Sequence, residues 1–78
     1  MREKKNWLII TFEQTTQAMQ MERIARREGA PGRIIPLPTQ ISAGCGLSWR
    51  ALPENRAKLE ALMRENGISH AGIVELYY

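Results

Sequence analysis

The chain is poor in the side chains that bind metals or form disulfides. It has one cysteine, Cys45, one histidine, His70, and no aspartate among its 78 residues. An internal disulfide needs two cysteines, so none can form. A self-contained structural zinc site usually takes four Cys or His ligands. We therefore expect neither a bound metal nor a cofactor.

Long apolar runs are also missing. The longest, Trp7–Ile10, is far shorter than the roughly 18 residues that a membrane-spanning helix requires. The basic start, Met1–Asn6, is not followed by an apolar stretch long enough for a secretory signal. We therefore expect a cytoplasmic protein with no membrane contact, in which a basic lead over 1–6 precedes one domain over 7–78.

The composition is that of a small globular protein and excludes a disordered tail or a collagen-like chain. Hydrophobic residues make up 44% and charged residues 24% of the sequence, which is ordinary for a folded chain. A length of 78 residues leaves room for one hydrophobic core. The net charge of +3 is too small to indicate a polyanionic partner, because glutamates are interleaved with the basic residues.

The first half of the chain predicts a buried strand followed by an amphipathic helix. The apolar, β-branched segment 7–12 is typical of a strand that is buried on both faces. Segment 13–28 predicts a helix with Thr15 or Thr16 as its N-cap and Gly29 as the residue that ends it. Residues at helical spacing predict its buried stripe, which is Ala18, Met21, Ile24 and Ala25.

The rest of the chain predicts three more strands and a second helix. Two prolines, Pro36 and Pro38, place the second strand at a sheet edge or end it early, because proline cannot donate to a ladder. Pro53 suits the first turn of the second helix, and Gly67 ends that helix. The expected strands are 32–37, 46–52 and 72–77, and the expected helix is 54–66.

Two strand–helix–strand units in succession give the element order βαββαβ. Right-handed crossovers then pack both helices on one face of a four-stranded antiparallel sheet. The sequence therefore predicts an α+β fold of the ferredoxin-like type. In the third strand, Leu47, Trp49 and Ala51 would face the helices, opposite Ser48 and Arg50.

The connection between the two units, 36–46, is too long for a simple hairpin and is rich in proline and glycine. The lone Cys45 lies in it between Gly44 and Gly46. Glycines let successive backbone N–H groups point at one spot, and such a nest would stabilise an anionic thiolate, persulfide or selenide. The nearest candidates to support it further are Thr39, Ser42, Arg33 and Arg50.

A second interpretation of Cys45 stays open on residue types alone. Free cysteines are among the most buried residues and commonly act as small hydrophobic side chains. In that case Cys45 would be a structural residue at the start of the third strand.

Several strings of this chain resemble one known family. Ile34–Pro38 followed by Ile41–Leu47 resembles the signature of the small selenium/sulfur carrier-like family, long catalogued only as a domain of unknown function. The most specific element is Ser42–Gly46. The opening and close of the chain are similar to that family as well, at Ile10–Phe12, Thr15–Ala18, Glu65–Ile68 and Ile73.

The resemblance implies a carrier in which Cys45 holds sulfur or selenium as a persulfide or selenosulfide. A donor such as a cysteine desulfurase or selenocysteine lyase would supply it, and a partner protein would receive it. The Cys-Pro-x-Pro motif of better-understood sulfur carriers is absent, and so is a second cysteine. The chalcogen must therefore leave to an external thiol, and we expect no enzyme activity from this chain alone.

His70 lies in the connection before the last strand. If the third and fourth strands pair antiparallel, the loops that precede them lie at opposite ends of the sheet. We therefore do not expect a Cys45–His70 dyad, which would need hydrogen-bond reach.

Nucleic acid is a weaker alternative, and we do not expect it as a partner. Only Trp49, beside Arg50, falls where an RNA-binding strand would display a ring. Trp49 alternates with core residues, so packing against the helices is the simpler interpretation. The basic residues of the first helix, Arg23, Arg26 and Arg27, are typical of a solvated face.

The remaining alternative is a non-catalytic protein-interaction or regulatory module in which the cysteine is structural. Small domains of this type gain stability from association, so a homo-oligomer is expected under this hypothesis. The apolar, aromatic segment Leu76–Tyr78 would then supply a contact surface.

Overall fold

A computed structural model of the chain describes residues 4–42 and 44–78. The first half of the expected basic lead, Met1–Glu3, and Ala43 of the cysteine loop lie outside the described residues. The elements follow the predicted order: β1 Asn6–Thr11, α1 Thr15–Glu28, β2 Arg33–Pro36, β3 Leu47–Ala51, a short 3₁₀ turn Pro53–Asn55, α2 Arg56–Glu65 and β4 Gly72–Tyr77.

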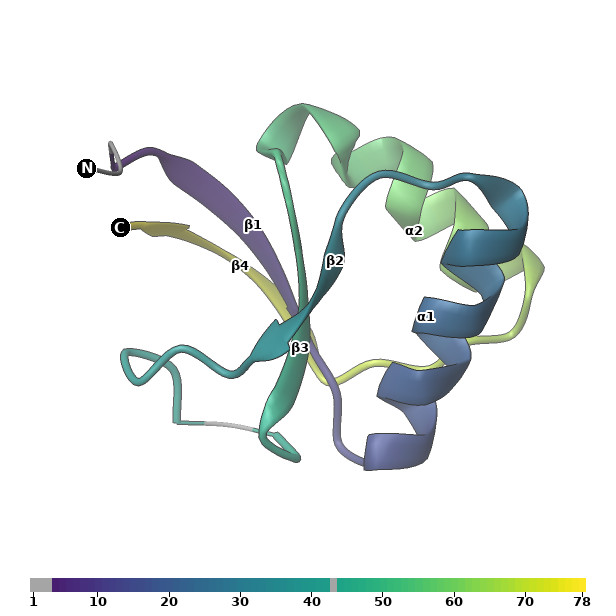
Figure 1. Ribbon diagram of the computed structural model, residues 1–78, viewed down its shortest axis with the longest axis horizontal. Helices are drawn as coiled ribbons and strands as arrows, with labels where there is room; N and C mark the ends of the chain where they lie inside the picture. The colour runs from purple at the N-terminus through teal and green to yellow at the C-terminus, as the bar shows by residue number, and fades with distance from the viewer. Residues whose placement is uncertain (1–3, 43) are drawn as a thin grey trace.

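The described strands form one antiparallel sheet with the order β2-β3-β1-β4. Both helices cover the same face of this sheet (Figure 1). The α+β, ferredoxin-like prediction is therefore confirmed. The edge position predicted for the proline-ended strand is confirmed too, because β2 is an outer strand.

The core lies between the sheet and the helices and is centred on β1. Leu8, Ile10 and Phe12 are fully buried there against Trp49. The Trp49 indole N–H donates to the Pro31 carbonyl at 3.0 Å, so its only polar atom is satisfied. The first helix contributes the predicted buried stripe, Ala18, Met21, Ile24 and Ala25, and α2 contributes Leu59 and Met63, with Leu62 partly buried beside them.

The start of α1 differs from the sequence prediction. The N-cap is Gln14, in extended backbone, and not Thr15 or Thr16. The side chain of Gln17 turns back, and its Oε1 accepts hydrogen bonds from the backbone N–H groups of Glu13 and Gln14 at 3.0 and 3.3 Å. A glutamine at the third helical position can satisfy free N–H groups that a hydroxyl cap would otherwise leave to water.

The face of the sheet without helices is also partly buried. Ile9, Ser48 and Ile35 are almost inaccessible to solvent but lie outside the core between sheet and helices. Pairing across strands puts Ile9 opposite Arg50 and Ile35 opposite Ser48, so they share the helix-free face. The expectation that β3 is buried on one face only is therefore wrong for Ser48, whose hydroxyl donates to the Ile35 carbonyl at 3.4 Å.

Two methionines of α1 that differ in burial provide a test of this core. Met21 is fully buried, whereas Met19 is 52% exposed on the same helix. We expect Met21→Ala to lower the free energy of unfolding by about 2–4 kcal/mol, because it leaves a cavity in the core. The matched control Met19→Ala should change it by about 0.5 kcal/mol or less. Urea unfolding followed by circular dichroism measures both values, and equal losses would contradict this packing of α1.

Candidate functional site

Three backbone hydrogen bonds shape the loop that carries Cys45. The Leu37 N–H donates to the Gly46 carbonyl at 2.9 Å and closes the loop at its base. The Ile41 N–H donates to the Pro38 carbonyl at 2.9 Å and forms a turn. The third bond, from the Cys45 N–H to the carbonyl of Phe12, is also 2.9 Å long. The cysteine backbone is therefore tied to the end of the central strand.

Gly44 is required by this contact. Its φ is +100°, and a Cβ built there would lie 2.6 Å from the Phe12 carbonyl oxygen. Any larger side chain would have to push the loop away from the end of β1, because real Cβ atoms do not approach an oxygen so closely. The neighbouring Gly46 also has a positive φ, +95°, but a Cβ there meets open space.

The Cys45 side chain is half-buried and unbonded to any other sulfur. It packs against the core between sheet and helices. Its thiol lies within weak hydrogen-bonding distance of the Leu47 carbonyl, with 3.9 Å between Sγ and O. Because the residue is only partly buried, the geometry accommodates both a reactive thiol and a packed one.

The structure gives the surroundings of three of the residues predicted to support this thiol. Thr39 and Ser42 are exposed, and the Thr39 hydroxyl donates to the side chain of Gln40 at 3.4 Å. Arg50 lies on the helix-free face, where its guanidinium stacks 4.1 Å from the centroid of the Trp7 ring. That is the opposite face from the core against which Cys45 packs. The proximity of these side chains to the thiol remains a prediction from the sequence.

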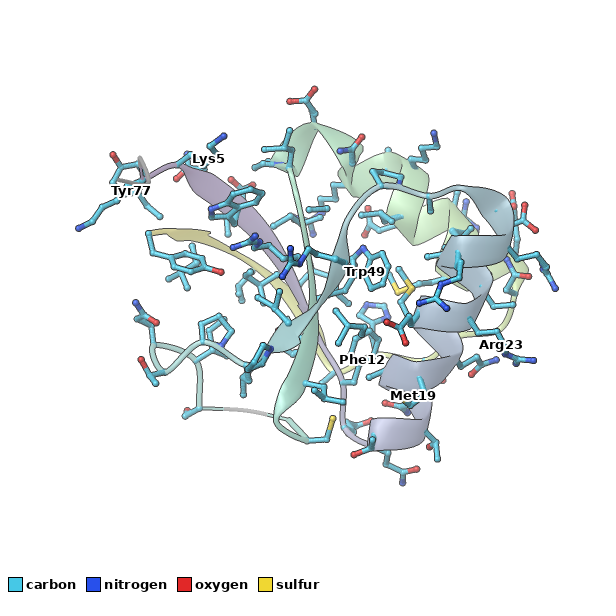
Figure 2. All side chains as sticks on the ribbon, in the orientation of Figure 1. Lys5, Phe12, Met19, Arg23, Trp49 and Tyr77 are labelled. Carbon is cyan, nitrogen blue, oxygen red and sulfur yellow. The ribbon has the colours of Figure 1, made fainter. Side chains whose placement is uncertain are left out.

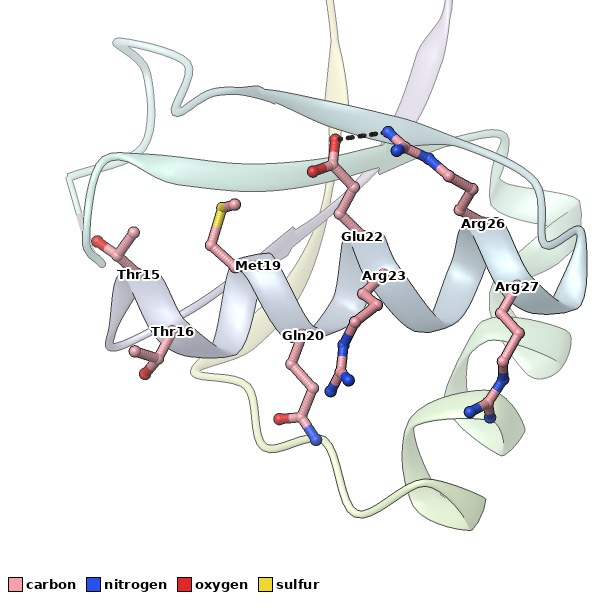
Figure 3. Close-up of a pocket in the computed structure, with 8 residues that line it drawn as sticks. All are labelled: Thr15, Thr16, Met19, Gln20, Glu22, Arg23, Arg26 and Arg27. Atoms are coloured by element: carbon pink, nitrogen blue, oxygen red, sulfur yellow. Dashed lines mark ion pairs between the residues drawn. The ribbon is translucent and has the colours of Figure 1, made fainter.

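A feature that sequence reasoning missed is the start of α1. Phe12, which accepts the Cys45 N–H, is followed after two residues by α1, and Figures 1 and 3 show the loop before β3 close to the first turn of this helix. A helix start carries a partial positive charge. The first turn of α1 contains no acidic residue that would offset it. The chain places one carboxylate nearby, that of Glu13, which lies between Phe12 and the N-cap Gln14.

The geometric argument that separated His70 from Cys45 is wrong. The third and fourth strands do not pair with each other; each pairs antiparallel with β1, so the two run parallel. The loops before them consequently emerge at the same end of the sheet. The Cys45 N–H binds the Phe12 carbonyl and the Ala71 N–H binds the adjacent Thr11 carbonyl at 2.7 Å. His70 is exposed there, and the described residues show no hydrogen bond from its ring.

Trp49 and the arginines of α1, which were considered for nucleic-acid binding, have other surroundings in the structure. Trp49 faces the helices and is buried, so it offers no ring for stacking a base. The basic face of α1 (Figure 3) borders a hollow of about 650 Å³. Two of its cations are engaged: Arg26 pairs with Glu22 at 3.7 Å and Arg27 with Glu28 at 3.1 Å. This face is therefore consistent with a solvated helix surface.

Metal binding and membrane insertion have no support in the described part of the chain. No group of three or more His, Cys, Asp or Glu side chains gathers there in a way that could hold a metal ion. No described helix has both the length and the apolar character needed to cross a bilayer.

The contrast between Gly44 and Gly46 gives a direct test of the loop anchor. We expect Gly44→Ala to lower the free energy of unfolding by about 2–3 kcal/mol, because it combines backbone strain with a clash at the Phe12 carbonyl. Gly46→Ala, with strain alone, should lower it by about 1 kcal/mol. Urea unfolding of both variants measures the difference, and a smaller loss for Gly44→Ala than for Gly46→Ala would show that the loop is not held against β1.

Comparison with known proteins supports the resemblance noted from the sequence. Neither curated proteins nor solved structures give a match. The family model described as "Putative Se/S carrier protein-like" matches residues 7–75 and thus spans nearly the whole domain, including the cysteine loop. The chain therefore belongs to the Se/S carrier protein-like family.

Proposed function

We propose that this protein carries sulfur or selenium on Cys45 and passes it to a partner protein. The family description points to such a cargo. The observation that carries the proposal is the position of the only cysteine in the chain: it is partly buried, in a loop whose backbone is tied to the end of β1.

The chemistry of loading needs no net oxidation. The Cys45 thiolate attacks the outer sulfur or selenium of a donor persulfide or selenosulfide, and a new bond to the Cys45 sulfur forms as the donor bond breaks. The donor leaves as a thiolate, which takes up the proton that Cys45 lost. Delivery repeats the same exchange with an acceptor thiolate as the attacking group.

The local structure supports this exchange in two ways. The start of α1 lies near the loop, and its free N–H groups suit the binding of a negatively charged cargo. Gly44 and Gly46 carry no side chains that could shield the sulfur from an approaching partner. The loop is also held by its bonds to Phe12 and Leu37, so little conformational entropy is lost on docking.

The absence of a second cysteine determines how the cargo leaves. An internal thiol would release it by forming a disulfide within the chain, but the sequence contains Cys45 alone. Release therefore requires an acceptor thiol from another molecule. The protein acts between separate donor and acceptor proteins, and it is not itself an enzyme.

One observation favours a second function, that of a protein-interaction module with a structural cysteine. The Cys45 side chain packs against the core, as a small apolar residue would. Under this alternative, the thiol would react only after the protein unfolds.

Loading of Cys45 can be measured directly. We expect incubation with a cysteine desulfurase and cysteine, or with a selenocysteine lyase and selenocysteine, to add one sulfur or one selenium atom to the intact protein. Intact-mass spectrometry without reductant detects the adduct and identifies the cargo. Cys45→Ser is the matched control and should remain unmodified, because it keeps the size of the side chain but lacks the nucleophilic sulfur.

Alkylation separates the two functions independently of any donor. Because Cys45 is only partly buried, iodoacetamide should label it in native buffer at a rate within about tenfold of the rate in urea. Labelling that occurs only in urea, together with no adduct from either donor, would contradict the carrier function and favour the structural one.

A further inference from the structure

The charged residues of the sheet are separated between its two faces. Within the described strands, Arg33 and Arg50 lie on the helix-free face, where they are direct cross-strand partners. The strand carboxylate, Glu75, is paired with Leu8 and therefore belongs to the other face. The helix-free face thus has cations and no strand carboxylate.

Two like charges placed directly opposite each other destabilise a sheet unless something offsets them. Among the described residues, the ion pairs all involve arginines of the two helices, and neither Arg33 nor Arg50 has a carboxylate within 4.0 Å. Lys5 adds a further cation on this face, with its Nζ 5.4 Å from the centroid of the Trp7 ring. The face therefore has a local excess of positive charge that the chain itself does not neutralise.

The arrangement of the Arg50 guanidinium suits the binding of an oxyanion. Its guanidinium stacks on Trp7 at 4.1 Å, which uses the flat face of the group and leaves the N–H donors at its edge available. Those donors match the two oxygens of a carboxylate. The stacked ring also restricts the side chain, so less entropy is lost when it binds.

The two arginines stand between two hollows of this face. One, of about 430 Å³, is bounded by Ile35, by the loop segment 36–40 and by Tyr78. The other, of about 300 Å³, is bounded by Trp7 and by the residues around Leu52. Both hollows are lined by Arg33 and Arg50, so they adjoin at these two cations, and we call the pair of hollows the groove.

We propose that this groove binds an acidic, extended segment of the protein with which Cys45 exchanges its cargo. The choice of partner rests on the proposed function. The loop segment 36–40 that forms one wall continues to Cys45, and the bond from Leu37 to Gly46 joins the two parts. A segment seated in the groove would therefore contact the same loop that presents the thiol.

The observations favour a protein segment over single-stranded nucleic acid. Nucleic acid of this kind is bound by stacking bases on exposed aromatic rings. Here the Trp7 ring is already covered by Arg50 and approached by Lys5, and Trp49 is buried on the other face. Carboxylates need only the arginine donors, and apolar side chains flanking them can occupy the hollows.

The two tryptophans allow binding to be located. A short blocked peptide of alternating Glu and Ala is added to the full ¹⁵N-labelled chain, and the two indole N–H signals are followed by NMR. We expect the Trp7 signal to shift and saturate. The Trp49 signal serves as an internal reference, because this indole is buried and bonded to Pro31. No shift at Trp7, or an equal shift with a Gln-Ala peptide, would overturn the proposal, as would tighter binding of oligothymidylate.

Charge variants test the named residues. Arg33→Gln and Arg50→Gln should each weaken peptide binding by roughly tenfold, because each removes charge-assisted hydrogen bonds. The matched control is Arg23→Gln, which removes the same charge from α1 on the far side of the molecule (Figure 2) and should weaken binding by less than about twofold. Equal effects of all three variants would show non-specific attraction and overturn the proposal.

Two measures keep this result independent of folding and of chalcogen transfer. Arg33 is exposed, so its variant reports on the groove even if replacing the stacked Arg50 disturbs the fold. The titration is repeated with Cys45→Ser, in which loading is impossible. Binding that persists in this variant supports the groove whether or not Cys45 carries a cargo, and loading without peptide binding would overturn the groove alone.

Discussion

The end of the central strand β1 holds the cysteine loop and the loop before β4 in place. Thr11, the last residue of that strand, and Phe12, which follows it, are buried, and their carbonyls accept the N–H groups of Ala71 and Cys45 respectively. These two bonds attach the loop before β4 and the loop before β3 to adjacent points. Because β1 is buried on both faces and paired on both edges, its end is a rigid reference point. The position of the cysteine therefore depends on packing around β1 more than on the loop's own sequence.

The two faces of the sheet have different roles as a consequence. One face is covered by α1 and α2 and contains the core, against which Cys45 packs. The other carries Arg33, Arg50 and the Trp7 ring, above a thin buried layer that includes Ile9 and Ile35. The loop between β2 and β3 starts beside the helix-free face and returns to the helix-covered one. A protein that docks on this loop can therefore contact the arginines and the thiol through one continuous segment.

Much of the fold could be predicted from the sequence because the relevant signals are local. The apolar run 7–12, the spacing of Met21 and Ile24, and the left-handed Gly29 each define an element or its end through neighbouring residues. The predicted N-cap of α1 was wrong because several polar residues precede the helix, and the Gln17 and Ala18 N–H groups, which a Thr15 hydroxyl would accept, bind the Gln14 carbonyl instead. The prediction that His70 and Cys45 lie at opposite ends of the sheet was also wrong. It depends on strand order, which is set by contacts between residues far apart in the sequence.

By itself, the sequence determined the element order, the edge position of β2, the family resemblance and the presence of a single thiol between two glycines. These follow from residue types and their spacing. Only the tertiary structure decided that Gly44 must be small because the Phe12 carbonyl is 2.6 Å from its Cβ position, and that Arg50 stacks on the Trp7 ring. The physical reason is that strand register sets which side chains share a face, and register is fixed by contacts between segments many residues apart.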